Sequence, residues 1–152
     1  NLRDLRSKIG RQSNIRLLQL TWKGDAKPAD IARAGGTLTY AQMLTPAGLK
    51  EVATYADGIG PELRSIIPLD ATGALGAPTT LVRDAHAAGL MVVPYTFRPE
   101  NSFIAANLRR GAENARNTEG SIAEIRAYLA TGIDAFFTDD PAVGRQAVDG
   151  AP

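Results

Sequence analysis

The sequence has 152 residues, of which 44% are hydrophobic and 22% charged, with a formal net charge of +1 and no cysteine. A chain of this length forms one domain with its own core, and the composition is that of a globular protein. The balanced charge, without a run of five like charges, argues against a nucleic-acid-binding face or a polybasic membrane patch. The absence of cysteine excludes disulfides, thiolate metal sites and a cysteine nucleophile. No apolar run approaches the ~20 residues of a membrane span.

The first predicted element begins almost at the first residue, in the amphipathic segment NLRDLRSKIG. The chain has no initiator methionine and no signal peptide, and this abrupt start leads us to expect a processed or truncated product. Leu2, Leu5 and Ile9 recur at helical spacing and Gly10 is a glycine stop, which predicts a helix over residues 2–9.

The next segments alternate between short apolar runs and a helical pattern. Residues 14–22 form an apolar run that predicts a strand. Residues 23–40 are rich in Gly, Ala and Lys without periodicity and predict a long loop. Thr45 and Pro46 supply an N-cap and a first-turn proline for a helix that ends before Gly58.

The middle of the chain repeats this alternation. Residues 57–63 predict a second strand, which leaves through a Gly-Pro pair into a loop. Thr79 or Thr80 caps the next helix, which Gly89 closes. The third strand, MVVPYTF, runs over 91–97.

The last third contains one more helix, strand and helix. After a polar segment over 101–120, which we expect to be partly helical, Ser121 and Glu124 form the pattern of a capping box. A strand over 133–139 follows, and a short last helix reaches about Val148.

This order, one helix and then four units of strand, loop and helix, is typical of an α/β protein with a parallel sheet. Buried parallel strands consist of unbroken apolar runs, as these do. We expect the strands near 15–21, 57–60, 91–97 and 133–138 to lie adjacent in that order with right-handed crossovers.

Polar side chains gather where the predicted strands end. The C-terminal ends of parallel strands meet at one edge of a sheet, where their side chains reach a ligand. The candidates at this edge are Gln19, Thr21, Trp22, Gly60, Pro61, Glu62, Tyr95, Thr96, Arg98, Thr138, Asp139 and Asp140.

Arg98 is the most informative of these candidates. Its guanidinium is a planar fork of donors that suits a carboxylate or a phosphate. Two interpretations stay open: Arg98 binds an anionic ligand, or it forms an ion pair with Glu100, Asp139 or Asp140.

Asp139, Asp140 and His86 are weaker candidates for a functional role than Arg98. Asp140 precedes Pro141 and is best explained as a helix N-cap. Asp139 is placed to orient a catalytic group or to ligate a metal, but Mg²⁺ and Ca²⁺ need several oxygen ligands, and the sequence offers no obvious second and third. His86, the single histidine, lies in a predicted helix away from the strand ends and favours a structural role.

The segments EVATYADGIGPEL, DAHAAGLMVVPYTFRPEN and GIDAFFTDDP resemble the C-terminal half of glycerophosphodiester phosphodiesterases, particularly the periplasmic bacterial type. The resemblance runs in order from Leu2 to about Val148. It implies that residues 1–152 form a parallel (β/α) half-barrel, strands five to eight of a TIM (β/α)8 barrel. The implied reaction is metal-dependent hydrolysis of glycerophosphodiesters to sn-glycerol 3-phosphate and an alcohol, in the periplasm or outside the cell.

The resemblance also implies how the site is divided. The His-Arg-Gly and His-Asp motifs that carry the acid/base histidines, and the Glu and Asp ligands of the divalent metal (Ca²⁺ or Mg²⁺), belong to the N-terminal half and are absent here. We therefore expect no catalytic residue and no metal ligand in this chain, and we expect the chain alone to be inactive. The positions that match the family make Arg98, Tyr95, Thr96, Gln19 and Asp139 the expected substrate-side or supporting residues.

The expected partner of this chain is the N-terminal half of the same barrel. Half of a barrel leaves unpaired strand edges and an open apolar inner face, which that half, or a second copy in a homodimer, would cover. The alternative interpretation is a non-catalytic half-barrel that binds an anion or associates with itself.

Overall fold

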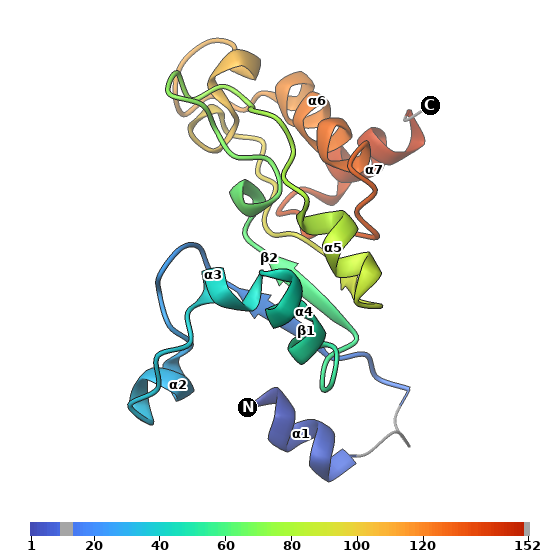
Figure 1. Ribbon diagram of the computed structural model, residues 1–152. Helices are drawn as coiled ribbons and strands as arrows, with labels where there is room; N and C mark the ends of the chain where they lie inside the picture. The colour runs from blue at the N-terminus through green and yellow to red at the C-terminus, as the bar shows by residue number, and fades with distance from the viewer. Residues whose placement is uncertain (10–13, 151–152) are drawn as a thin grey trace.

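The computed structural model describes residues 1–9 and 14–150 and contains a small parallel sheet with helices around it (Figure 1). The strands are β1 (Leu18–Thr21), β2 (Gly58–Pro61) and β3 (Met91–Val92). They lie in the order β1-β2-β3, and both neighbouring pairs are parallel. The predicted α/β class with a parallel sheet is confirmed.

The predicted fourth strand is present as an extended segment rather than as a regular strand. Its residues run parallel to the end of β3, with a parallel bridge between Phe97 and Thr138. The amide of Asp134 donates to the carbonyl of Val92 at 3.0 Å, and the amide of Phe137 donates to the carbonyl of Pro94 at 2.9 Å. Pro94 has no N–H to donate in return, which contributes to the irregular pairing of this segment.

Helices fill the connections between the strands. Each is short, and one-turn 3₁₀ helices occupy the loops after β2 and β3. The elements are α1 (Leu2–Ile9), α2 (Ala29–Arg33), α3 (Tyr40–Met43), α4 (Pro46–Val52), η1 (Leu63–Ser65), α5 (Leu81–Ala87), η2 (Asn101–Phe103), η3 (Ala106–Leu108), α6 (Thr118–Leu129) and α7 (Pro141–Asp149).

Two helix starts that the sequence predicts are confirmed. The hydroxyl of Thr45 accepts from the amide of Gly48 at 3.1 Å, and Pro46 is the first residue of α4. Asp140 accepts from the amide of Val143 at 3.0 Å at the start of α7. Local hydrogen bonding of the cap residue decides both starts, which is why the sequence suffices.

Two local predictions need correction, and a third is confirmed in part. The segment 23–40 is not all loop, because it contains the short helix α2. The capping box at Ser121 and Glu124 is wrong: α6 begins a turn earlier, and the side chain of Asn117 accepts from the amide of Gly120 at 2.9 Å. At α5 neither threonine is a simple cap.

At α5 the role of a helix cap is divided between the two threonines. Thr80 occupies the cap position, but its hydroxyl donates to the carboxylate of Asp84 at 2.6 Å. The hydroxyl of Thr79 accepts from the amide of Leu81 at 3.3 Å.

The core lies on one face of the sheet, beneath α4, α5, α6 and α7. The register pairs Gln19 with Ile59 and Ile59 with Val92, so these side chains share that face, and Ile59 and Val92 are fully buried. Burying this face against the helices supplies the main favourable term for folding. Figure 1 shows α6 beside α7, and the two helices are in contact.

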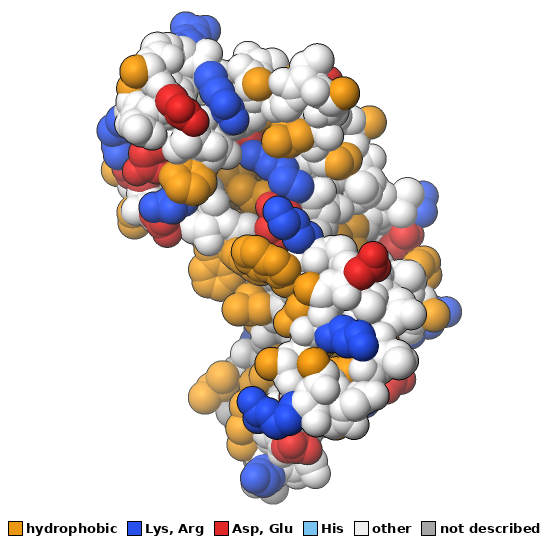
Figure 2. All heavy atoms as spheres, turned by 90° about the vertical axis from the view of Figure 1, so that its left-hand side faces the viewer, with side chains coloured by type: hydrophobic (Ala, Val, Ile, Leu, Met, Phe, Trp, Pro, Cys, Tyr) orange, Lys and Arg blue, Asp and Glu red, His pale blue; other side chains and the backbone are white. Residues whose placement is uncertain are grey.

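The other face of the sheet is much less covered. Leu20 is 52% exposed, and Gly60 lies beside it with no side chain of its own. A Cβ on Gly60 would come within 2.5 Å of Leu20 Cδ2, so glycine is what lets the leucine lie across the strand. Figure 2 shows one side of the molecule, where hydrophobic side chains gather across the middle next to basic and acidic ones.

Candidate functional site

A groove lies at the C-terminal ends of the strands. It has a volume of about 290 Å³ and is lined by Leu20, Tyr95, Thr96, Phe137, Thr138 and Asp139. Tyr95, Thr96 and Asp139 are residues that the sequence predicts for the site, and the parallel order of the strands brings them together here. A cavity with apolar walls and a few converging polar groups is the usual form of a small-molecule site.

Tyr95 forms one wall of the groove. Its hydroxyl donates to the carbonyl of Thr21 at 2.9 Å, and its ring stacks on Trp22 with centroids 6.4 Å apart. Burial raises the pKa of Tyr95 above its ordinary value, with the nearby Glu62 acting in the same direction. The tyrosine is therefore a neutral, fixed wall at neutral pH.

Arg98 is paired, and its partner is Asp139. Arg98 Nε lies 2.9 Å from Asp139 Oδ2 and 3.9 Å from Glu100 Oε2. Its guanidinium carbon is 4.1 Å from the centroid of the Phe103 ring. Within residues 1–9 and 14–150, neither Nη atom of Arg98 forms a hydrogen bond to the protein. The ion-pair interpretation therefore describes one edge of this guanidinium, while the donors at its far end are open to a ligand.

Asp140 is structural, as predicted. It caps α7, and its other oxygen is paired with Arg116. The hydrogen bond from Val143 and the contact with Arg116 lower the pKa of Asp140. Asp140 is therefore not a partner of Arg98.

His86 is also structural in its placement. His86 Nε2 lies 2.9 Å from Asp134 Oδ2, which accepts in addition from the amide of Val92 at 2.7 Å. The pair ties α5 to the segment that runs beside β3. Neither side chain lines the groove.

Gln19 lies apart from the other predicted residues. It faces the helix side of the sheet, where its amide oxygen accepts from the hydroxyl of Tyr55 at 3.3 Å. It lines a separate pocket of about 330 Å³ between α1, α2 and β1. The sequence argument misplaces it because successive residues of a strand point to opposite faces, and Leu20 is the β1 residue that reaches the groove.

Three residues of this region are not predicted from the sequence. Leu20 and Phe137 both line the groove. The alternation of side chains along a strand identifies them only when the strand register is known. Phe103 covers Arg98 only because the one-turn helix η2 brings it back over the strand end, and no sequence pattern signals that contact.

Buried polar atoms that form no hydrogen bond lie at the same edge. In the described part of the chain they are Thr21 Oγ1, Arg98 Nε and Glu100 Oε2, although Arg98 Nε is within ion-pair distance of both Asp139 and Glu100. Each belongs to a residue at or just beyond a strand end. Buried polar atoms are normally satisfied, so their concentration here distinguishes this edge from the rest of the fold.

The described residues do not fit a metal site by themselves. No group of three or more His, Asp or Glu side chains among residues 1–9 and 14–150 lies close enough to hold an ion. Asp139, the carboxylate of the groove, is paired with Arg98, and Ca²⁺ or Mg²⁺ requires several oxygen ligands. The described helices include none long and apolar enough to cross a membrane.

Comparisons with known proteins show the family of this chain. The model of the glycerophosphoryl diester phosphodiesterase family matches residues 1–143. The chain belongs to this family. The Arabidopsis thaliana protein named glycerophosphodiester phosphodiesterase GDPD6 is 42% identical over 102 residues, which is 66% of this chain and 25% of the plant protein.

A solved structure supports the fold. A Silicibacter pomeroyi protein provisionally described as a glycerophosphoryl diester phosphodiesterase matches 98% of this chain with a TM-score of 0.54 and 18% identity, over 36% of its own length. This phosphodiesterase-family chain thus spans between a quarter and about a third of the length of these relatives.

Proposed function

We propose that this chain is the C-terminal half of a glycerophosphodiester phosphodiesterase, strands five to eight of a (β/α)8 barrel. The complete enzyme would hydrolyse glycerophosphodiesters to sn-glycerol 3-phosphate and an alcohol. The observation that carries the proposal is the family match over residues 1–143, together with a groove at the ends of parallel strands, where barrel enzymes bind their substrates.

The groove residues then take substrate-side roles. The open Nη atoms of Arg98 would bind a phosphoryl oxygen, a contact that fits a guanidinium fork. Tyr95 and Thr96 would line the wall beside the glycerol or the alcohol, and Asp139 would hold Arg98 through its Nε edge. Gln19 would support the rim from behind β1 rather than contact the substrate.

The proton-transfer groups and the metal would come from the N-terminal half. A divalent ion, Ca²⁺ or Mg²⁺, would there supply stabilisation of the charge on the phosphoryl group. This assignment follows the division of the site that the resemblance to the family implies.

The partially uncovered sheet face supports a partner half. Leu20, Trp22 and Phe137 are 52%, 50% and 46% exposed, and Leu20 and Phe137 line the groove at the strand ends. Exposed apolar surface costs about 25 cal/mol per Å². We propose that the N-terminal half of the barrel covers this face, and that the enzyme acts in the periplasm or outside the cell, as in the periplasmic bacterial type it resembles.

The test is an assay of the complete protein, this chain joined to its N-terminal half, with glycerophosphocholine and a divalent ion. We expect release of sn-glycerol 3-phosphate, detected enzymatically. An inactive complete protein that binds glycerol 3-phosphate or forms dimers would contradict the proposal and favour the non-catalytic half-barrel.

A further inference from the structure

Phe103 contacts Arg98 through its ring, and its backbone is held by hydrogen bonds. Phe103 is 46% exposed, yet its ring lies 4.1 Å from the guanidinium carbon of Arg98. Its backbone is fixed at both ends, because its amide donates to the carbonyl of Glu100 at 3.0 Å and its carbonyl accepts from Arg64 Nη2 at 3.0 Å. The backbone that carries this ring is therefore held in place, and the ring lies against Arg98.

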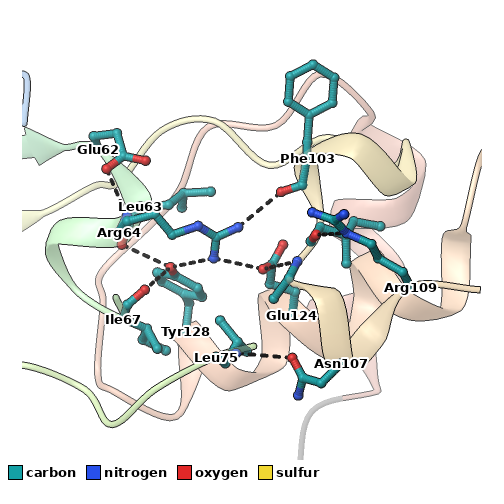
Figure 3. A network of polar contacts seen from close by, with 12 residues as sticks. Glu62, Leu63, Arg64, Ile67, Leu75, Phe103, Asn107, Arg109, Glu124 and Tyr128 are labelled. Carbon is teal, nitrogen blue, oxygen red and sulfur yellow. Dashed lines mark hydrogen bonds and ion pairs between the residues drawn. The ribbon is translucent and has the colours of Figure 1, made fainter. Parts of the chain in front are cut away.

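Arg64 is itself anchored in the core. Its Nη1 donates to Glu124 Oε1 at 2.8 Å and to the hydroxyl of Tyr128 at 3.2 Å (Figure 3). Glu124 is 2% exposed and also accepts from the amide of Ala105 at 3.1 Å. Figure 3 shows the Phe103 carbonyl directed toward Arg64 while the ring points away from it. The chain of contacts runs from α6 through Arg64 to the Phe103 backbone.

Asp139 and Phe103 cover two parts of the Arg98 guanidinium and leave its Nη atoms uncovered. Asp139 faces the Nε edge at 2.9 Å and Phe103 covers one face of the guanidinium. Among the described residues, the Nη atoms have no hydrogen-bond partner. A guanidinium stacked on a ring loses rotational freedom without losing its donors.

We propose that Phe103 is a positioning residue for Arg98: its ring, carried on a backbone that Arg64 and Glu124 hold, keeps the guanidinium oriented with its Nη donors open to an anionic phosphodiester. The inference rests on the proposed function only where it names the phosphodiester. The orientation of the Arg98 guanidinium depends only on its contacts with Phe103 and Asp139.

The test uses the complete protein with ¹⁵N-labelled arginine, and the Arg98 side-chain NMR signal is assigned by its loss in Arg98→Lys. In Phe103→Leu we expect the ring-current shift of this signal to disappear and the side chain to become more mobile. Phe103→Tyr should retain both. Arg64→Lys, which keeps a cation near Glu124 but loses the guanidinium fork, should move the signal in the same direction as Phe103→Leu.

Kinetics provide the second measurement. Phe103→Leu should lower kcat/KM for glycerophosphocholine by about two- to fivefold through KM, with kcat little changed, and Phe103→Tyr should restore it. An Arg98 signal that is unchanged in Phe103→Leu would overturn the inference, as would a lower kcat/KM without a shifted signal. If the wild-type protein hydrolyses nothing, the proposed function fails, and the NMR measurement still decides whether Phe103 positions Arg98.

Discussion

From the sequence alone, Arg98 either binds an anionic ligand or forms an ion pair with an acidic residue. In the structure the two roles are compatible. The sequence identifies a cation at a strand end with three acidic residues nearby, and cannot say which of them it meets. The structure gives Asp139 as the partner at 2.9 Å and assigns Asp140 to a helix cap. A partner on one edge of a guanidinium does not prevent a ligand from binding the other, because its donors lie in a planar fork.

In the complete enzyme, Arg98→Ala should lower kcat/KM by about ten- to more than a hundredfold, the effect of losing a charged hydrogen bond of about 1.5–3 kcal/mol. The stability of the protein should change little, because the side chain is 40% exposed. Steady-state kinetics and thermal denaturation separate the two effects. Arg145→Ala is the matched control: Arg145 is an exposed arginine paired with Asp149 on α7, and its loss should leave kcat/KM unchanged.

At the scale of single elements, the sequence predicts the helix starts that are set by hydrogen bonds between residues close in the chain. Thr45 with Pro46 and Asp140 with Pro141 specify helix starts because cap and first turn are adjacent in the chain. Ser121 and Glu124 mislead for the opposite reason. Glu124 is used by Arg64, a residue 60 positions away, and a pairing over that distance cannot be read from a four-residue motif.

The cap of α4 gives a direct stability test. Thr45→Ala removes the acceptor for the amide of Gly48 and should lower the free energy of unfolding by about 0.5–2 kcal/mol, measured by urea denaturation. Thr45→Ser keeps the hydroxyl and should fall within a few tenths of a kcal/mol of the wild type. Equal losses in both variants would show that the methyl group, not the cap, matters.

The contact between α5 and the segment beside β3 should depend on pH. Burial acts to raise the pKa of Asp134, but the amide of Val92 and His86 outweigh it, and the pKa is lowered. A carboxylate with a lowered folded-state pKa contributes stability above its unfolded value, about 3.9, and this contribution is lost as the pH falls through the folded pKa.

We therefore expect the free energy of unfolding to decline below about pH 4 in the wild type and less steeply in Asp134→Asn. Denaturation series at successive pH values measure both slopes. Identical slopes would mean that the Asp134 contact does not survive in solution.

For the molecule as a whole, strand order and direction were predictable and the covering of the sheet was not. The alternation of apolar runs and helical segments predicts four adjacent parallel strands. The structure contains three, and the fourth segment runs beside β3 without forming a regular strand. The periodicity of the sequence does not tell what lies against the face that carries Leu18 and Leu20, because periodicity reports which residues share a face and not what covers that face.

A substitution on this face tests whether it is covered in the complete enzyme. Leu18, on the edge strand β1, is only partly exposed on this face. In the complete barrel, Leu18→Ala should cost about 2–5 kcal/mol, because it would empty space in a closed core. Leu69→Ala, at a loop leucine that is 38% exposed, should stay within about 0.5 kcal/mol of the wild type. Similar small losses at both positions would show that the face is open.

The central claim is that this chain is the substrate-side half of a phosphodiesterase whose proton-transfer and metal-binding residues lie in the other half. The most direct measurement compares glycerophosphocholine hydrolysis by the purified 152-residue chain, by the N-terminal half, and by the two mixed with a divalent ion. We predict no turnover by either half and release of sn-glycerol 3-phosphate by the mixture. Turnover by the 152-residue chain alone, with its identity verified by intact mass spectrometry, would contradict the claim.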